Sequence, residues 1–416
     1  MLGVLEIAGR GSGFLRRREA GYLPSNGDVH VGERIIRQYG LRPGDEIEGE
    51  TKPGGRGRGP TLERVTAVLG RPPEQLRGRP EFPRLSAIHP NELIRLETRL
   101  IRSGQPDPTN RVIDLLTPLG KGQRALIVAP AKAGKTMVLQ AIAQGVSENY
   151  PEATLLILLV DERPEEVFEM EAAGVGEVIA SSFDNPASQH VAVAELTLER
   201  ARRRVELGED VVLIVDSLTR LARAYNTVEK GTGRTLSGGL DAQSLEKPKR
   251  FLGSARKVDP AQGGGSLTII ATALVDTGSK MDQVIFEEFK GTGNSELVLS
   301  RELAERRIFP AIDLVASATR REELLLDPET LEASRALRQR IASMTPINAM
   351  NDLLVDLRRH PTNGELVRNL SSEAAAAPPR ADGRSPAAAA QPPGRTPTAQ
   401  PRRPGGRGDR GTGTHR

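Results

Sequence analysis

The sequence predicts a doubly wound α/β domain that is preceded by a small β-barrel and followed by a disordered tail. Three patterns lead to this fold class. An apolar strand runs into a phosphate-binding loop, apolar strands alternate with helical stretches through the middle of the chain, and short strands with glycine-rich turns fill its beginning. We expect the barrel at 1–70, a connector at 71–110, the α/β domain at 111–373 and the tail at 374–416.

Short apolar segments separated by turns rich in Gly, Pro, Ser and Asn form the expected barrel. These segments are Val4–Ile7, Gly13–Arg16, Asp28–Val31, Asp45–Thr51 and Leu62–Leu69. Their number and length are typical of a barrel of the OB or cold-shock type. Such barrels commonly bind single-stranded nucleic acid, and a purely structural barrel is the alternative.

The connector is rich in Pro and Arg, and the tail from Ala374 shows no apolar periodicity. Such a tail cannot bury enough surface to offset its chain entropy, so we expect disorder. It carries eight arginines against two aspartates, which puts the tail at +6 and the rest of the chain at −2. Any nucleic-acid function of the body therefore depends on local basic patches.

Composition excludes several classes of protein. The chain has no Cys, so disulfides and thiolate metal sites are excluded. The sequence contains no apolar run of membrane-spanning length and no signal-peptide pattern at its start. It also shows no zinc-type spacing of His, Asp and Glu, and no Ser or Cys nucleophile arrangement. We therefore expect a cytoplasmic protein without a membrane partner.

Unbroken apolar runs predict the buried parallel strands of the α/β domain. These runs are Leu126–Val128, Leu155–Val160, Val178–Ser181, Val211–Val215 and Leu267–Ala271. Helical stretches fill the intervals at Lys135–Gln144, Glu165–Ala172, Gln189–Glu206, Leu218–Tyr225 and Arg321–Ser343. This alternation predicts a doubly wound sheet with helices on both faces.

The phosphate-binding loop at Ala129–Thr136 is the strongest functional signal, although Ala129 replaces the usual first glycine. Gly134 allows backbone N–H groups to turn toward phosphate oxygens. Lys135 can reach the terminal phosphates, and the Thr136 hydroxyl can bind a magnesium ion. The helix that follows points its N-terminal dipole at the anion. The loop therefore predicts a nucleoside triphosphate site with Mg²⁺.

Acidic residues follow two of the predicted strands. Asp216 ends one apolar run, where it can lie near the magnesium ion, or else cap the helix that begins at Leu218. Glu162 and Arg163 follow another run, and parallel strand ends converge at the ligand. Glu162 could orient or deprotonate an attacking water, and Arg163 could sense phosphate.

Late in the same domain four arginines cluster, namely Arg301, Arg306, Arg307 and Arg320. An arginine that reaches a neighbour's γ-phosphate would stabilise transition-state charge, whereas most surface arginines do nothing of this kind. Two glycine-rich loops, Val228–Asp241 and Asp276–Asp282, could grip a sugar–phosphate backbone in a central pore with Lys280. Both could equally be plain surface loops.

Taken together, these segments resemble the Rho family of bacterial transcription termination factors. The resemblance runs from about Val4 to Leu370, and its most specific stretches are Leu126–Thr136, Asp161–Val167, Ser181–His190, Asp216–Val228, Leu267–Asp282 and Phe289–Asn294. It implies a RecA-like P-loop motor domain in a homohexameric, RNA-dependent ATPase and helicase that releases nascent RNA from RNA polymerase. Contacts with RNA polymerase and elongation factors stay open.

The resemblance also implies roles for individual residues at the ATP site. ATP contacts would come from Gly120, Lys121, Gly122, Gln123, Arg124, Ala125, Lys132, Ala133, Gly134, Lys135, Thr136, Met137 and Arg163. Glu162 would activate water, and Thr136 and Asp216 would hold the metal. Arg320 resembles a finger supplied in trans, and Arg307 a second phosphate contact. Met137 and Phe309 would pack on adenine.

For RNA, the resemblance implies contacts from the barrel and from two pore loops. The implied residues are Gly11, Ser12, Gly13, Phe14, Leu15, Arg16, Asp28, Val29 and His30, with Val228–Asp241 and Lys280 in the pore. Ser12 and His30 replace family aromatics, another aromatic before Leu62 is missing, and we expect no family helical segment before the barrel. The site would keep Phe14 and depend on Arg10, Arg16, Arg17, Arg56 and Arg58, with weaker pyrimidine preference and steeper salt dependence.

Two other functions compete with this interpretation. Another ring ATPase with a RecA-type fold, such as a rotary or secretion motor, would share the phosphate loop and turn over without RNA. A passive single-strand binder or RNA chaperone would bind RNA without turnover. The barrel and the Lys280 loop favour RNA over the first alternative, and Glu162 argues against the second.

Overall fold

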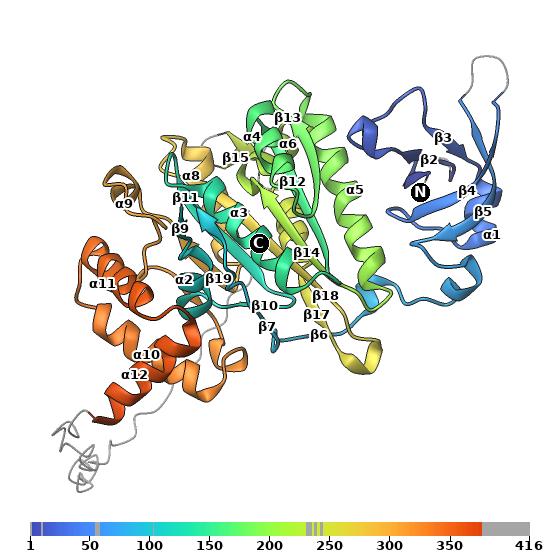
Figure 1. The fold of residues 1–416 in the computed structure, drawn as a ribbon. Helices are drawn as coiled ribbons and strands as arrows, with labels where there is room; N and C mark the ends of the chain where they lie inside the picture. The colour runs from blue at the N-terminus through green and yellow to red at the C-terminus, as the bar shows by residue number, and fades with distance from the viewer. Residues whose placement is uncertain are drawn as a thin grey trace, which may run out of the picture. The chain divides into compact units, whose positions relative to one another are not determined.

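A closed five-stranded barrel and a nine-stranded sheet organise the chain in the computed structural model (Figure 1). The structure describes residues 2–9, 11–54, 59–102, 104–229, 235–236, 239–241 and 244–376. Arg10, Arg56, Arg58 and the predicted tail from residue 377 onward lie outside the described residues. The architecture confirms the predicted fold class of a barrel followed by an α/β domain.

The barrel has the strand order β1-β2-β3-β5-β4, the order of an OB-type barrel. Its strands are β1 (Gly3–Ile7), β2 (Gly13–Arg16), β3 (Val29–Val31), β4 (Glu46–Lys52) and β5 (Thr61–Val68). Every predicted barrel strand is present, within one or two residues of its expected bounds. Helix α1 (Glu33–Tyr39), between β3 and β4, was not predicted. Leu5, Leu15, Val31 and Ile47 fill the interior with no exposed surface.

The connector consists of short turns and strands, one of which joins the large sheet. They are two 3-10 turns, Pro73–Leu76 and Phe82–Arg84, and the two-residue strands β6 (Ala87–Ile88), β7 (Leu93–Ile94), β8 (Ile101–Arg102) and β9 (Gln105–Pro106). Strand β6 pairs with β17 (Arg256–Val258), so the connector contributes a strand to the large sheet. Helix α2 (Thr109–Leu116) follows.

Parallel strands form the centre of the large sheet, in the order β13-β12-β14-β18-β11-β19. Their bounds are β11 (Arg124–Pro130), β12 (Thr154–Glu162), β13 (Glu177–Ser182), β14 (Asp210–Asp216), β18 (Ser266–Val275) and β19 (Ser295–Val298). Strand β19 was missed because its sequence, Ser-Glu-Leu-Val, lacks an apolar run. Since these strands are parallel, their carboxyl ends lie along one edge, where ligands bind in such sheets.

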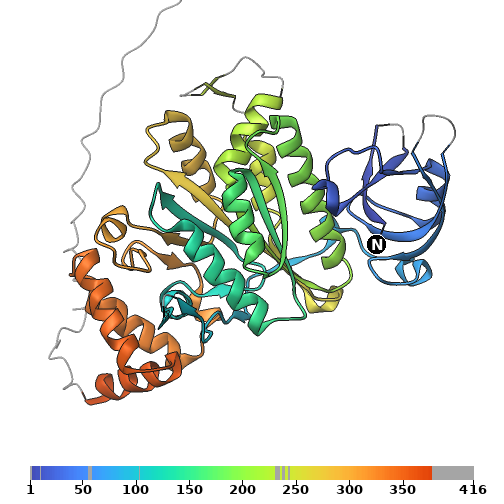
Figure 2. The ribbon, with the colours of Figure 1, turned by 45° about the horizontal axis from the view of Figure 1, so that its top comes forward.

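Helices cover both faces of this sheet (Figure 2). Along β12, Leu155, Ile157 and Leu159 pack on the side of α3 (Lys135–Asn149), whereas the alternate residues pack on the side of α5 (Ala187–Val205) and α6 (Leu218–Val228). The strand is therefore apolar on both faces, as its unbroken run predicted. Further helices are α4 (Pro164–Ala172), α7 (Glu246–Leu252), α8 (Lys280–Lys290) and α9 (Arg301–Glu305).

The predicted helix at Arg321–Ser343 is wrong at its beginning. The structure has a 3-10 turn at Glu322–Leu324, and α10 runs from Pro328 to Ile341. The Asp327 side chain accepts a hydrogen bond of 3.0 Å from the Thr330 backbone N–H, and proline is favourable in the first turn, so the helix begins there. Helices α11 (Pro346–Arg359) and α12 (Asn363–Ala376) follow.

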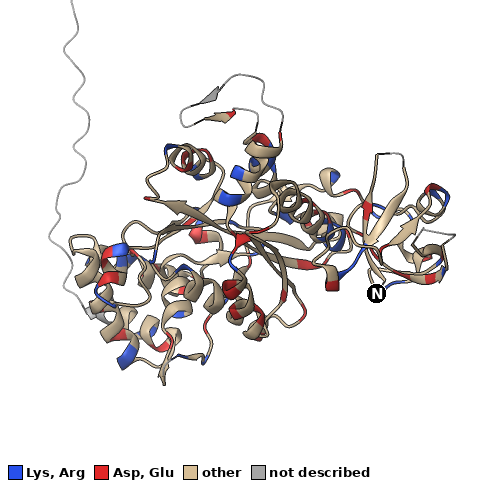
Figure 3. Ribbon diagram, turned by 90° about the horizontal axis from the view of Figure 1, so that it is seen from above, with Lys and Arg blue, Asp and Glu red and all other residues tan. Residues whose placement is uncertain are grey.

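Charge is spread along the chain, with basic and acidic positions interspersed along the ribbon (Figure 3). Among the described residues, no helix is both long and apolar enough to cross a bilayer.

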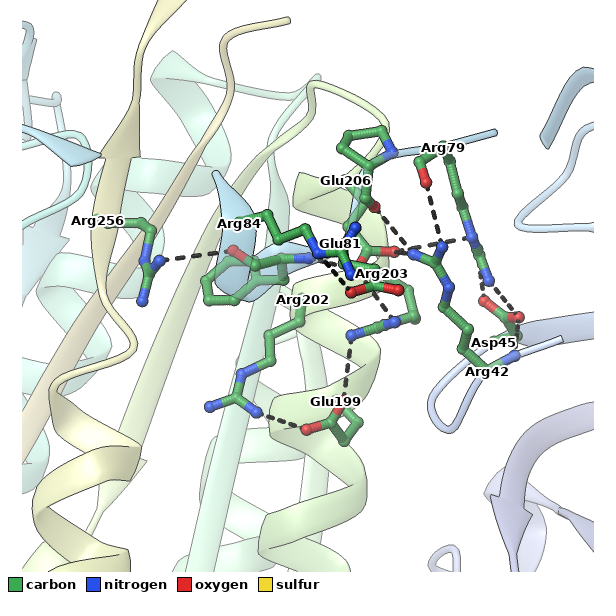
Figure 4. Close-up of polar contacts among 12 residues, drawn as sticks. Arg42, Asp45, Arg79, Glu81, Arg84, Glu199, Arg202, Arg203, Glu206 and Arg256 are labelled. Atoms are coloured by element: carbon green, nitrogen blue, oxygen red, sulfur yellow. Dashed lines mark hydrogen bonds and ion pairs between the residues drawn. The ribbon is translucent and has the colours of Figure 1, made fainter. Parts of the chain in front are cut away.

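Helix α5 holds the barrel through buried ion pairs. Glu206, whose side chain has no exposed surface, accepts hydrogen bonds from Arg42 of the barrel at 2.9 Å and from the Phe82 backbone N–H at 2.8 Å. Arg79 of the connector pairs with Asp45 at 2.6 Å (Figure 4). The Glu206 carboxylate therefore links the barrel and the connector to the end of α5.

A second group of contacts lies beside the first on the same helix. Arg200 pairs with Glu46 of β4 at 2.6 Å and with Glu177 of β13 at 2.7 Å. At Gly44, a Cβ would lie 2.4 Å from the backbone N of Arg200, so only glycine allows the barrel this close to α5.

We predict that Glu206→Ala loosens the barrel. The change removes the buried carboxylate that Arg42, Arg79, Arg203 and the Phe82 backbone N–H share. Removing one partner of a buried pair costs about 3–5 kcal/mol. Chemical denaturation should show this loss in the free energy of unfolding, with faster proteolysis of the connector. Glu302→Ala, which removes an exposed pair with Arg306, should cost less than about 1 kcal/mol. Equal stability of the two variants would contradict the role of Glu206.

Candidate nucleotide and nucleic-acid sites

The phosphate-binding loop joins β11 to α3 at the carboxyl edge of the sheet. Gly134 has a φ of 84°, a left-handed conformation that glycine adopts at no cost, and it lies at the N-cap of α3. A Cβ at this position would lie 3.3 Å from the ring of Phe309, so Phe309 covers the loop. Gly134 therefore allows both the left-handed turn of the loop and the close approach of the Phe309 ring.

Lys135 lies between two carboxylates from neighbouring strands. Its Nζ is 3.0 Å from Oε1 of Glu162, at the end of β12, and 2.7 Å from Oδ1 of Asp216, at the end of β14. The Thr272 hydroxyl of β18 donates a hydrogen bond of 2.7 Å to the same Asp216 oxygen. Three parallel strands and the first residue of α3 thus contribute to one polar cluster.

Burial and charge shape the protonation of this cluster. Burial alone would lower the pKa of Lys135, but Asp216 and Glu162 raise it above its usual value, so the ammonium stays charged. Burial and the neighbouring Asp216 raise the pKa of Glu162. Its Oε2 is buried and has no hydrogen-bond partner among the described residues. An oxygen in this state is suited to accept a proton or a hydrogen bond from water.

A bulge presents Glu162 to the edge of the sheet. The pairing of β12 with β13 shifts between Val160 and Glu162, and Asp161 between them has a φ of 56°. The Asp161 carboxylate lies 3.8 Å from Arg220 and 4.0 Å from the His190 ring. Arg220 also lies 3.6 Å from Oε2 of Glu162. Neither Arg220 nor His190 was predicted, because no local pattern relates them to the loop.

The structure brings most of the predicted ATP residues to this edge. Lys132 and Ala133 lie in the loop, Thr136 and Met137 begin α3, and Arg163 is the exposed N-cap of α4. The Thr136 hydroxyl and the Asp216 carboxylate are oxygen ligands of the kind that Mg²⁺ prefers. Among the described residues, no group of three or more His, Asp or Glu side chains is placed to hold a metal ion.

The predicted ATP contacts of Gly120–Ala125 lie away from the phosphate loop of their own chain. Gly120 ends the short strand β10 (Leu119–Gly120), and Arg124 begins β11, about 20 Å from its other end at Pro130. Some of their polar groups already form hydrogen bonds within the chain, because the Gly122 N–H donates to the Thr268 hydroxyl and the Arg124 side chain donates to the carbonyl oxygen of Thr292. Within one chain they therefore brace the sheet and do not line the phosphate loop.

Arg320 also lies far from the phosphate loop of its own chain. Its backbone N–H donates to the carbonyl oxygen of Asn294, beside Arg124 at the start of β11. Its side chain is exposed. Arg307, also exposed, lies two residues before Phe309 and has a φ of 58°. Lys135 and Arg320 thus face opposite ends of one strand.

On the barrel, Phe14 and His30 form an aromatic pair across β2 and β3. Their ring centroids are 5.5 Å apart in an edge-to-face arrangement, and the Arg16 guanidinium lies 5.3 Å from the Phe14 centroid. Arg16 also pairs with Asp28 at 2.5 Å and with Glu6. Half-buried rings beside a guanidinium offer a stacking surface.

The other predicted RNA contacts on these strands differ in exposure. Gly11 and Ser12 are partly exposed in the turn before β2. Leu15 and Val29 point into the barrel core, and a Cβ on Gly13 would collide with the Glu6 carbonyl. The Leu15 and Val29 side chains therefore face the core and not a bound RNA, because strand residues alternate between core and surface, and Gly13 could offer only its backbone.

Of the two predicted pore loops, the structure describes Asp276–Asp282 fully and the other in part. Lys280 is the exposed first residue of α8. The loop is braced by Asp282, which accepts hydrogen bonds from Arg223 at 2.8 Å and from Thr277 at 2.6 Å. Residues 230–234, 237–238 and 242–243 lie outside the described part of the chain.

Two family models match the chain. The Rho termination factor RNA-binding domain matches residues 1–74, and the nucleotide-binding domain of the ATP synthase alpha/beta family matches residues 109–319. Among curated relatives, transcription termination factor Rho of Gemmatimonas aurantiaca is 55% identical over 361 residues, 87% of this chain but 49% of that protein. The Haemophilus influenzae and Escherichia coli factors are each 52% identical over 364 residues, covering 87% of this chain and 86% of theirs.

Solved structures share the fold. A type III secretion ATPase of pathogenic bacteria, 23% identical, matches 76% of this chain and 94% of its own with a TM-score of 0.57. The assembled ATPase EscN of enteropathogenic E. coli, 26% identical, covers 68% of this chain and 63% of its own with a TM-score of 0.53. The motor domain therefore has the fold of nucleotide-binding ATPases.

We predict that Lys135→Met destabilises the protein even without nucleotide. The change removes the cation that lies between two buried carboxylates and leaves only Arg220 near Glu162, and breaking a buried pair in this way costs about 3–5 kcal/mol. The free energy of unfolding from chemical denaturation measures the loss. Lys132→Met, in the same loop but exposed, should change it by no more than about 0.5 kcal/mol. Identical unfolding curves for both variants would contradict the ion triad.

Proposed function

The chain belongs to the family of transcription termination factor Rho, and on this premise we propose that it is an RNA-dependent ATP hydrolase that moves along nascent RNA and releases it from RNA polymerase. The chain spans about half the length of the Gemmatimonas relative and most of the other two. The observation that supports the proposal is one chain carrying both a Lys135–Glu162–Asp216 triad and an aromatic, basic barrel surface.

ATP would bind with its phosphates in the loop at Pro130–Thr136. Lys135 would then exchange its carboxylate partners in part for phosphate oxygens, since both are anionic acceptors. Glu162, whose Oε2 has no hydrogen-bond partner among the described residues, would orient and deprotonate the attacking water. A magnesium ion held by Thr136 and Asp216 supplies charge neutralisation for the phosphates. Arg163 is exposed at the same edge, where it can contact the terminal phosphate.

The site would be completed by a second copy of the chain. Arg320 cannot reach the phosphates bound to its own Lys135, because a strand of about 20 Å separates them. An arginine from a neighbour would stabilise the charge that develops on the transferred phosphoryl group. We therefore propose a homohexameric ring in which each interface combines Lys135 of one copy with Arg320 of the next, and in which Arg307 gives a second phosphate contact.

RNA would bind first to the barrel and then in the centre of the ring. Phe14 and His30 provide rings for base stacking, and Arg16 provides charge for phosphate. Lys280 would contact the RNA backbone from the start of α8. The barrel would span 1–70, the connector 71–110 and the motor 111–376, because α12 continues through Ala376, three residues into the predicted tail of 374–416.

A secretion-type ATPase is the second candidate, because the motor domain shares that fold. The barrel matched by the RNA-binding family model favours the RNA-dependent enzyme. Hydrolysis that single-stranded RNA stimulates supports the proposal. Hydrolysis at the same rate without RNA would favour the secretion-type motor.

We predict that two inactive variants restore each other when mixed. Arg320→Ala and Lys135→Ala should each lower hydrolysis by about 10²–10³-fold, as expected for removal of one preorganised charge. In mixed rings some interfaces regain an intact Lys135 and an intact Arg320, so part of the RNA-stimulated rate should return. A mixture no more active than its components would contradict a shared site. Lys52→Ala, on an exposed barrel residue, serves as the control.

We also predict that Phe14→Ala weakens RNA binding by about 1–3 kcal/mol, the value of one stacked base. Fluorescence anisotropy with a labelled oligocytidine measures the change in Kd. Phe168→Ala removes an exposed ring of α4 in the motor domain and should leave binding to the barrel unchanged. A Phe14→Ala protein that binds the oligomer as tightly as the parent would show that the barrel binds RNA by another surface.

A further inference from the structure

A cavity of about 600 Å³ lies where the connector meets the motor domain. Basic side chains line it, namely Arg202 of α5, Lys249 and Arg250 of α7, and Arg256 of β17, with Glu246 as the acidic lining residue. None of these residues takes part in the nucleotide site or in the aromatic surface of the barrel.

Arg256 is half-buried without a charged partner. Its guanidinium donates only to carbonyl oxygens, at 3.3 Å to Ser254, 3.4 Å to Leu85 and 3.5 Å to Phe82. Within the described part of the chain, no carboxylate forms an ion pair with it. Burial, and after it the nearby cations Arg202 and Arg124, lower the pKa of its guanidinium.

A stacked arrangement fixes the two guanidinium groups at the cavity. The Cζ atom of Arg256 lies 4.4 Å from the centroid of the buried Phe82 ring, and that of Arg202 lies 5.4 Å from it. Figure 4 shows Arg202 and Arg256 on the same side of the connector, away from the Glu206 ion pairs. Arg202 also forms an ion pair with Glu199 at 2.5 Å and donates to the Ser254 hydroxyl, and its buried Nε has no hydrogen-bond partner among the described residues. Both guanidinium groups are therefore held in place, and of the two Arg256 has no carboxylate partner among the described residues.

The other two cations form ion pairs that can exchange. Lys249 pairs with Glu288 and Arg250 with Glu246, and all four side chains are at least 39% exposed. Exposed pairs of this kind contribute little to stability, so an incoming anion can replace their partners at small cost. Planar guanidinium groups suit the paired oxygens of a phosphate.

We propose that this cavity binds the phosphodiester backbone of single-stranded RNA as the strand passes from the barrel to the ring. The inference rests on the proposed function and adds a binding site outside the barrel and the pore loops. The connector residue Phe82 lies eight positions after the end of the matched RNA-binding domain, so the cavity follows that domain directly. A strand leaving the barrel would meet these cations there.

The test compares the salt dependence of binding for two RNAs with the full chain. One oligocytidine of about 8 nucleotides fits a single barrel of this type, and a second is several-fold longer. Variants are Arg256→Gln and the double variant Lys249→Gln with Arg250→Gln. For the long RNA, the slope of log Kd against log salt should fall by about 0.7 for each phosphate that the variant no longer neutralises. For the short RNA, Kd and slope should not change.

The controls separate charge from folding. Arg256→Lys keeps the charge and should retain most of the slope, and Arg358→Gln removes an exposed charge of α11 without effect. Unchanged slopes for the long RNA would overturn the inference, and so would equal losses for both RNAs, since the cations would then act through the barrel. Binding of inorganic phosphate without any change for RNA would also overturn it, by showing a small-anion site. Failure of the parent chain to bind either RNA would instead refute the proposed function.

Discussion

The ion pairs that join Lys135 to Glu162 and Asp216 are the interaction on which the nucleotide site depends. They exist because parallel strands end at one edge of the sheet, where β12, β14 and β18 each present a polar side chain. One cation balances two carboxylates while no phosphate is present. A bound triphosphate brings further negative charge to the same place. Its binding must therefore change which anions Lys135 pairs with. Oε2 of Glu162, which has Arg220 at 3.6 Å but no hydrogen-bond partner among the described residues, can then accept a hydrogen bond from water.

Because the central strands run in one direction, the residues of the proposed active site lie at opposite ends of the sheet. One active site therefore needs residues from two copies of the chain. Lys135 follows the carboxyl end of β11, and Arg320 lies beside its beginning, so one chain offers half of a site at each end. Helix α5 lies alongside this arrangement. Its C-terminal half anchors the barrel through Arg200 and, just beyond it, Glu206, and its first turns carry His190 beside Asp161. A single helix therefore contacts both the RNA-binding domain and the surroundings of Glu162.

Local patterns in the sequence predicted the parts of this structure that depend on local chemistry. Unbroken apolar runs predicted the buried strands, and the spacing of Gly134, Lys135 and Thr136 predicted the loop, because strand burial and phosphate binding both require contiguous residues. Strand β19 was missed since its partners, not its sequence, make it a strand. The positions of Gly120–Ala125, Arg220 and Arg256 depend on which strands and helices become neighbours, and no short segment contains that information.

The rate of RNA-stimulated ATP hydrolysis per chain, followed through a dilution series together with the native mass, tests the central claim most directly. If the site is shared between copies, the rate per chain should fall in step with the fraction of assembled protein and vanish when only single chains remain. A rate per chain that stays constant in solutions of single chains would contradict a shared site and with it the proposed mechanism.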